Sequence, residues 1–360
     1  MRGMKRIYAY DHAPLAFGFV QSPERFVVDE IPLHTPGTKG GYALLRVRKR
    51  DMTTYQLIDV IARAAEIAPR EVGYAGLKDK HATTTQYLTV PRNALKRLHK
   101  GLRSERIAIF EEGFSALPLK VGALKGNRFC IILDNVLPQE AGVLEKRLHS
   151  VAKGGFPNYF GFQRFGRDGE SWREGEKLTK EGARLRTPRQ RMAVTAYQSH
   201  LFNGWLAQRV KINTTVRDLS AADAAKALKF PAALIDALVR QPHCFKLFLG
   251  EVMRKGTRYY HLSALFKEAK AFASHRVTPT GLLCGAHTLR AKSDARHLEA
   301  LFDDDALVSL RGDRRDAWVY AEDVSMSYDA AAKEATVRFT LPKGAYATVF
   351  LEEVKCAALF

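Results

Sequence analysis

A single carboxylate lies between two lysines in a loop of small residues. Asp79 follows Lys78 and precedes Lys80 within residues 73–86. An isolated Asp has a pKa of about 3.9, and nearby positive charge lowers this value. We therefore expect Asp79 to be ionised at neutral pH, where a carboxylate close to a ribose or a base can act as nucleophile or general base. Taken alone, the segment is slightly more typical of an Asp that only caps a β-turn.

A second segment combines aromatic rings with arginines and amides. Residues 158–167 contain four aromatic residues, two arginines and the amides Asn158 and Gln163. Such a loop can stack a base on a ring such as Phe160, hydrogen-bond the base edge through an amide and hold phosphate through Arg164. For any single ring, a place in the hydrophobic core is an equal alternative. The mixture as a whole favours RNA.

Several enzymatic motifs are missing from the sequence. Residues 161–166 have the glycine spacing of a P-loop, but Lys and Ser or Thr do not follow. The sequence contains no G-x-G-x-x-G, G-x-S-x-G or H-E-x-x-H motif, and its four cysteines are far apart. We therefore expect no cofactor and no metal, and an S-adenosylmethionine-dependent methyltransferase is disfavoured.

The composition is that of a basic globular protein. The 360 residues include 57 Lys and Arg against 38 Asp and Glu, a net charge of +19, and 46% of the residues are hydrophobic. This balance excludes disorder as the main state and makes nucleic acid the first expected partner, ahead of an anionic membrane surface. No apolar run approaches 18 residues, so we expect a cytoplasmic protein that does not enter a membrane.

Basic residues gather in four clusters. Nine Lys or Arg lie within residues 164–191, and the other clusters are residues 46–50, 96–106 and 254–258. Each cluster alone is more typical of a solvated surface. Together with the net charge, some of them are expected to line a surface that binds a nucleic-acid backbone.

Regular elements should hold the Asp79 loop in place. A capping box of Thr53 and Gln56 predicts the start of a helix, which Pro69 should end. Extended segments at residues 71–74 and 84–90 should then flank a loop.

Strands near both chain ends enclose a helical middle. Strands are expected at about residues 106–110 and 127–133, and a buried helix at residues 189–210. Val337, Phe339 and Leu341 alternate as in a strand, which a turn should join to a final strand at residues 347–354. The pattern predicts an α+β fold whose sheet is interrupted by an insertion.

These segments resemble a known family. Residues 73–86 resemble the signature A-G-x-K-D-K-x-A-x-T-x-Q of the TruD family of tRNA pseudouridine synthases, and residues 158–166 resemble its N-Y-F-G-x-Q-R-F-G motif. Four further segments are similar to the family: residues 22–30, 119–129, 196–203 and 339–348.

The resemblance implies a V-shaped protein of two domains. Residues 1–182 and 308–360 would form a discontinuous catalytic domain with the α+β pseudouridine-synthase fold and a mixed, largely antiparallel sheet. Residues 183–307 would form an inserted α+β TRUD domain. The implied activity is that of an isomerase, an intramolecular transferase, which converts uridine 13 of tRNA to pseudouridine without a cofactor. We expect tRNA as the partner, a monomer, and no obligatory protein partner.

The resemblance also implies roles for individual residues. Asp79 would be the catalytic aspartate, Phe160 the ring against the target base, and Asn158 a neighbour that shapes the loop. Lys78 would give electrostatic support, and we add Gln163 and Arg164 as substrate-binding residues. Asp79 could attack C1′ or C6 or remove the 2′ proton. The competing hypothesis is a noncatalytic RNA-binding or chaperone protein.

Overall fold

The computed structural model describes residues 6–166, 168–308 and 310–359, which form two compact units. Unit 1 contains Met1–Ala13, Gly154–Tyr320 and Thr348–Cys356. Unit 2 contains Pro14–Lys153, Ala321–Ala347 and Ala357–Phe360. These units divide the chain at other positions than the expected domains, whose boundaries at residues 182/183 and 307/308 stay a prediction.

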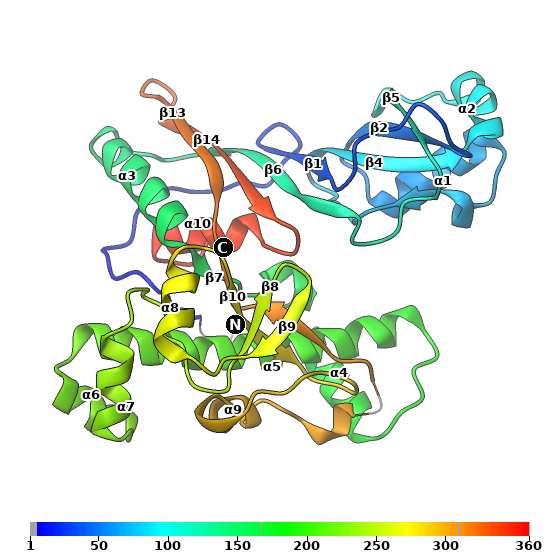
Figure 1. Ribbon diagram of the computed structural model, residues 1–360. Coiled ribbons are helices and arrows are strands. Elements are labelled where there is room, and N and C mark those ends of the chain that lie inside the picture. The colour runs from blue at the N-terminus through cyan, green and yellow to red at the C-terminus, as the bar shows by residue number, and fades with distance from the viewer. Residues whose placement is uncertain (1–5, 167, 309, 360) are drawn as a thin grey trace. The chain divides into compact units, whose positions relative to one another are not determined.

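A large sheet forms the framework of unit 2. In the described residues it has eight strands in the order β13-β14-β6-β1-β4-β2-β5, with β3 paired to β4 (Figure 1). The β1–β4 pair is parallel and the other pairs of this sheet are antiparallel, which confirms a mixed, largely antiparallel sheet. The strands are β1 (Phe26–Pro32), β2 (Tyr42–Arg50), β3 (Gly73–Tyr74), β4 (Thr83–Pro91), β5 (Ile107–Ser115), β6 (Leu124–Leu133), β13 (Glu322–Asp329) and β14 (Glu334–Pro342).

Strands from distant parts of the sequence share this sheet, as predicted. β14 pairs with β6 so that Val337 lies opposite Ile131 and Phe339 opposite Phe129. Alternate residues of β14 are buried, and the rings of Phe129 and Phe339 stack with their centroids 5.4 Å apart. Apolar contacts along one face of the sheet therefore hold the C-terminal strands to the N-terminal ones.

Helices of unit 2 cover the apolar face of the sheet. The predicted capping box is present, and Thr53 caps α1 (Thr54–Ala65). Leu57 and Ile61 of α1 lie in one hydrophobic cluster with Leu45 and Val47 of β2. The helix ends before Pro69, because Glu66 adopts a left-handed conformation that closes its C-terminus. The other helices of unit 2 are α2 (Leu95–Gly101) and α3 (Pro138–Gly154).

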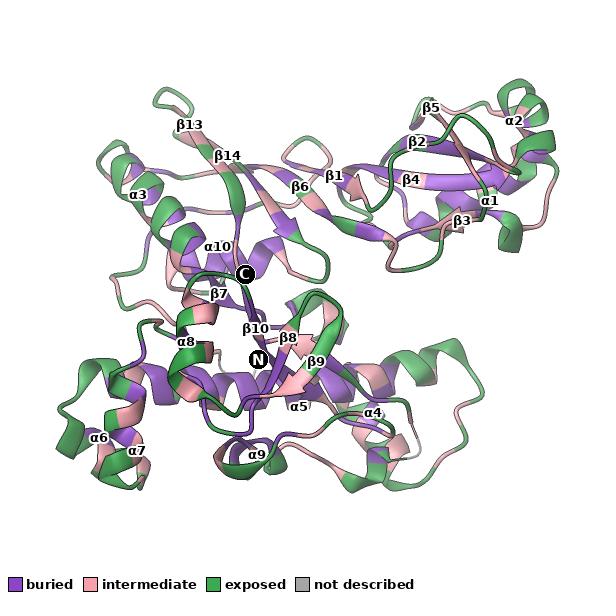
Figure 2. Ribbon diagram, in the orientation of Figure 1, coloured by how far each residue is buried: buried purple, intermediate pink, exposed green. Residues whose placement is uncertain are grey.

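Unit 1 is organised around a 31-residue helix, α5 (Pro188–Asp218). Its middle is buried on all sides while its ends are more exposed (Figure 2). In the described residues, a four-stranded sheet of order β11-β10-β8-β9 and a two-stranded sheet, β12-β7, belong to this unit. The strands are β7 (Phe156–Pro157), β8 (Val252–Lys255), β9 (Arg258–His261), β10 (Thr278–Leu283), β11 (Asp313–Asp316) and β12 (Trp318–Val319). The remaining helices are α4 (Ser171–Lys180), α6 (Ala221–Leu228), α7 (Ala232–Val239), α8 (Leu265–Ala273), α9 (Ser293–Ala300) and α10 (Ala347–Lys355).

Among the residues that the structure describes, no helix has both the length and the apolar character needed to cross a membrane.

The prediction of a strand at residues 347–354 is wrong. These residues form α10, and the hairpin partner of β14 is the preceding strand β13. The segment is buried on every side, so its apolar residues do not reveal a period. A short apolar run of this kind cannot be assigned to strand or helix from its pattern alone.

α10 carries a carboxyl group inside unit 1. Glu353 is 1% exposed, and its Oε2 accepts a hydrogen bond of 3.0 Å from the amide of Ala9. Burial raises the pKa of Glu353 from 4.5 to about 8, because the charged form loses its hydration. The side chain therefore holds the N-terminal segment mainly in its protonated form at neutral pH.

Replacing Glu353 by Gln keeps an acceptor for the Ala9 amide and removes the ionisation. A carboxyl with a raised pKa takes up protons on folding, so the free energy of unfolding of the unmodified protein falls as the pH rises from 4.5 towards 8. Between these pH values, the free energy of unfolding of Glu353→Gln should rise relative to that of the unmodified protein by up to about 1.4 kcal/mol per pH unit. Urea unfolding at several pH values measures the difference. Identical pH dependence of the two proteins would contradict the assignment.

Candidate active site

Asp79 lies in a loop of unit 2 that joins β3 to β4. Residues 75–82 form neither helix nor strand, which confirms the predicted loop. Such a segment lacks the ladder of hydrogen bonds that fixes a strand. Main-chain hydrogen bonds hold its two ends, from the amide of Gly122 to Ala75 O and from that of Asp51 to Ala82 O, and side chains hold the part between them.

The first of these side chains is Lys49 of β2. Its ammonium donates hydrogen bonds to the backbone carbonyl oxygens of Asp79, at 2.7 Å, and of Met52, at 2.5 Å. Lys49 is 0% exposed and was not among the predicted site residues. The strand alternates inward-facing residues at Leu45, Val47 and Lys49, so a lysine in an apolar register is the signal that could have found it.

The second is an ion pair between Lys78 and Glu30 of β1. The Lys78 ammonium lies 2.5 Å from Glu30 Oε2, and both side chains are almost completely buried. The amide of Lys78 donates to the hydroxyl of Thr54 at the start of α1, at 2.9 Å. A Cβ atom at Gly76 would approach the Lys78 ammonium to 3.3 Å, which favours glycine there. The structure thus places Lys78 in the support of the loop.

Burial sets the direction of the Asp79 pKa. The pKa of this carboxyl is raised above its ordinary value, because lost hydration outweighs the attraction of Lys49 and, more weakly, of Lys78. Lys78 does lower this pKa, as expected, but burial raises it by more, so the expected net decrease is wrong. The sequence showed the charges beside Asp79 but not the burial of its carboxyl. A carboxylate with a raised pKa is more basic than usual, which favours proton abstraction.

Asn158 and Phe160 lie in unit 1, directly after β7. The side chain of Asn158 is buried, donating to Asp316 O at 2.9 Å and accepting from Arg315 Nη2 at 2.7 Å. Arg315 also donates to the backbone oxygen of Asn158 at 3.0 Å. Arg315 comes from β11, about 155 residues later, and no sequence motif pointed to it.

The ring of Phe160 is 7% exposed. The Arg315 guanidinium lies 4.0 Å from its centroid and that of Arg164 lies 5.5 Å away, while Phe202 of α5 meets it edge-on. The backbone of Phe160 is held by Asn203, which accepts from its amide at 2.8 Å and donates to its carbonyl at 3.1 Å. Packing and cation–π contacts thus fix this ring before any ligand binds.

The other two predicted residues of this segment differ in exposure. Arg164 is held by Ser199 Oγ at 3.0 Å and by the carbonyl of Thr195 at 3.3 Å, whereas Gln163 is exposed. Of the aromatic residues in the segment, Tyr159 and Phe165 are buried and Phe162 is 41% exposed. Arg167, the second arginine, lies outside the described residues. The structure therefore leaves Gln163 and Phe162 available at the surface.

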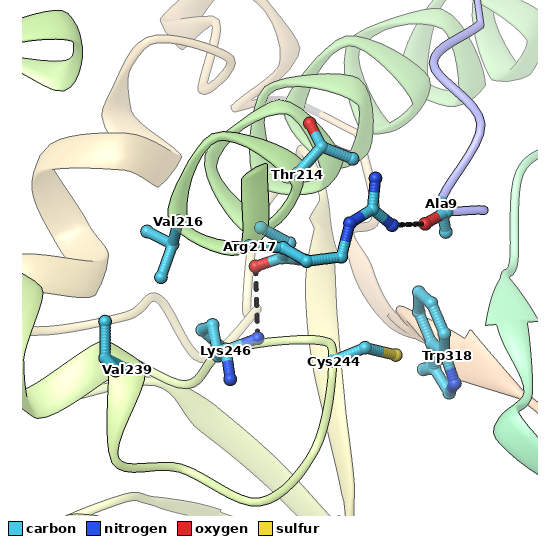
Figure 3. A pocket seen from close by; sticks show the side chains of 9 residues that line it. Ala9, Thr214, Val216, Arg217, Val239, Cys244, Lys246 and Trp318 are labelled. Carbon is cyan, nitrogen blue, oxygen red and sulfur yellow. Dashed lines mark hydrogen bonds between the residues drawn. The ribbon is translucent and has the colours of Figure 1, made fainter. Parts of the chain in front are cut away.

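Unit 1 also contains a cavity of about 260 Å³ away from these residues (Figure 3). Arg217, Lys246, Cys244 and Trp318 contribute to its wall. Arg217 donates to Ala9 O at 2.6 Å and the Lys246 ammonium to Gln241 O at 2.9 Å. Because both cations already bind carbonyl groups, we assign this cavity no function.

Comparisons with known proteins agree in the family that they identify. The family model of tRNA pseudouridine synthase D (TruD) matches residues 3–182 and 264–354. A protein named tRNA pseudouridine synthase D from Wolinella succinogenes is 36% identical over 359 residues, with 98% of each chain covered. One of the same name from Nitratiruptor is also 36% identical, over 358 residues and 98% of each chain. In fold, the chain is similar to a crystal structure titled as a TruD protein from Methanosarcina mazei, with a TM-score of 0.68 and 21% identity over 98% of this chain and 96% of that one.

The Lys78–Glu30 pair can be tested by a double-mutant cycle. Lys78→Met should lower the free energy of unfolding by about 3 to 5 kcal/mol, because it leaves the Glu30 carboxylate buried without its partner. The double variant Lys78→Met with Glu30→Leu should recover most of this loss. Denaturant titrations of the four proteins give the coupling energy. Additive effects would show that the two side chains do not interact.

Proposed function

We propose that the chain, which belongs to the tRNA pseudouridine synthase D family, forms pseudouridine in tRNA at uridine 13. Membership makes it an isomerase that forms pseudouridine in tRNA. The position in the tRNA rests on the resemblance of residues 73–86 and 158–166 to the family motifs.

The reaction moves one glycosidic bond within a nucleotide. The bond between C1′ and N1 breaks, the uracil turns, and a bond between C1′ and C5 forms. The proton on C5 is lost and N1 gains one, so no atom is added or removed overall. The protein must therefore hold the detached base and supply a group that starts the bond exchange.

The observation that carries the proposal is the Asp79 carboxylate with its support. Asp79 lies between β3 and β4, its main chain is held by Lys49, and its pKa is raised by burial. We propose that Asp79 is the catalytic group, acting as a nucleophile at C1′ or C6 or as the base that removes the 2′ proton. Lys78 supports the loop through Glu30.

A target base inside folded tRNA must first leave its stack, at a cost of a few kcal/mol. We propose that Phe160 contacts the flipped base, that Asn158 shapes this segment, and that Gln163 and Arg164 bind the nucleotide. The fixed ring of Phe160 supports this role, because a ring held in place loses little entropy when a base packs on it. Arg315 covers part of the ring, so the contact uses the portion that remains exposed.

Exposed arginines on the sheet of unit 2 support contact with the tRNA backbone. Arg46, Arg48 and Arg50 of β2 are exposed, and Arg128 of β6 and Arg338 of β14 lie on the same face of the sheet by register. Phosphate groups are the natural partners of such a surface.

Replacing Asp79 by Asn tests the catalytic assignment. The amide keeps the size of the side chain but can neither attack nor accept a proton, so the rate should fall by about 10²-fold or more. tRNA binding should be little changed. Carbodiimide labelling of pseudouridine in tRNA gives the rate, and gel-shift titration gives the affinity. If the Asp79→Asn protein still formed pseudouridine, the catalytic assignment would be wrong. If the unmodified protein bound tRNA without forming pseudouridine, the RNA-chaperone alternative would be favoured.

Replacing Phe160 by Leu tests the contact with the base. Leu retains much of the packing against Phe202 but cannot stack, so capture of the flipped base should weaken by about 1 to 3 kcal/mol, read as a lower kcat/KM. Phe162→Leu is the matched control, since it makes the same change at an exposed ring of the same segment. If Phe160→Leu and the unmodified protein had the same kcat/KM, Phe160 would have only a structural role.

A further inference from the structure

The basic cluster at residues 46–50 is divided by the alternation of β2. Arg46, Arg48 and Arg50 are exposed, whereas Lys49 lies on the opposite face with the apolar residues Leu45 and Val47. An ammonium in such a place costs free energy unless polar groups compensate it. A solvated surface therefore does not explain why a lysine lies at position 49.

The contacts of Lys49 join two segments of unit 2. Its ammonium binds the carbonyl of Met52, just before α1, and the carbonyl of Asp79 in the loop. In the described part of the chain, Lys49 forms no direct ion pair. Its charge instead attracts the Asp79 carboxylate without a direct contact between the two charged groups.

We propose that Lys49 is a positioning residue for pseudouridine formation, whose ammonium fixes the main chain at Asp79 and whose positive charge favours the ionised form of the Asp79 carboxylate. The proposal rests on the proposed function, because it gives Lys49 a role only through Asp79.

The charges around Lys49 favour this role over the alternatives. Among nearby charges Lys49 lowers the pKa of Asp79 most, against the larger opposite effect of burial. Lys78 contributes less, and its ammonium is engaged by Glu30. Asp51, which follows β2, pairs with His81 at 3.2 Å and with Arg106 at 3.2 Å.

Lys49 itself stays charged where the enzyme must work. Burial lowers its pKa to about 8, and the attraction of Asp79 opposes a larger fall. At neutral pH the ammonium is therefore the main form. The buried Lys49 ammonium and the half-buried Asp79 carboxylate each make the charged form of the other less costly.

Lys49→Met tests the proposal, because it removes the charge and both hydrogen bonds while keeping an unbranched apolar chain. At pH 7.5, kcat should fall by about tenfold or more while KM for tRNA changes by less than about threefold, the pattern of an interaction that serves the transition state. Without the ammonium the pKa of Asp79 rises further, so the acid limb of the pH profile of kcat should move to higher pH by about one unit. A role in folding alone would not move this limb.

Lys80→Met is the matched control. It removes a lysine that directly follows Asp79 but is exposed, so it should leave the acid limb where it is in the unmodified protein. Lys49→Gln separates the two functions, because an amide can still donate to the carbonyl oxygens but carries no charge. It should show the same displaced acid limb with smaller loss of stability, and it serves as the test if Lys49→Met does not fold.

The outcomes distinguish this proposal from the proposed function. An inactive Asp79→Asn together with an unshifted acid limb and unchanged kcat in Lys49→Met, or in Lys49→Gln, would overturn the role of Lys49 alone. An active Asp79→Asn would overturn the catalytic assignment itself. An acid limb of the kcat profile that moves to higher pH in both Lys49 variants, but not in Lys80→Met, would support the positioning role.

Discussion

The Asp79 loop has no strand partner of its own, so the candidate site depends on charges buried beneath it. Lys49 projects from β2 and binds the main chain of the loop, and Glu30 projects from β1 and binds Lys78 within the loop. Buried ionic groups add little net stability, and removing one member of such a set is costly. What they provide here is geometry, because an ammonium can satisfy two carbonyl groups that no neighbouring strand reaches.

A different solution holds the aromatic segment of unit 1. There the residues are fixed by side-chain contacts from elements far away in the sequence, namely Arg315 of β11 and Asn203 of α5. Arg315 binds the backbone and the side chain of Asn158 and lies over the ring of Phe160, so one side chain orders two predicted site residues. Both groups of predicted site residues are therefore held in place by neighbours to which we assign no catalytic role.

Local signals in the sequence predicted much of this organisation. The capping box at Thr53 and Gln56 and the loop at residues 75–82 depend on nearby residues and were confirmed. The sheet shared by both chain ends was also foreseeable from the alternation in residues 337–341. The helix α10 was not, because uniform burial removes the period that separates helix from strand. The raised pKa of Asp79 and the role of Arg315 depend on burial and long-range contacts, which one sequence read locally does not contain. Lys49 was readable as a lysine in an apolar register, yet it was grouped with its exposed neighbours.

The place of β14 in the sheet affects how the protein is made. β14 pairs with β6 along eight residues, but its residues are synthesised about 200 positions after β6 is complete. At 5–20 residues per second, this delay lasts roughly 10 to 40 s. During that time the growing chain presents β6 as an open edge, which can pair wrongly with other chains. The sheet that supports Asp79 can close only after residues 334–342 have been synthesised, so until then nascent copies of this protein expose an edge at which they can pair with one another.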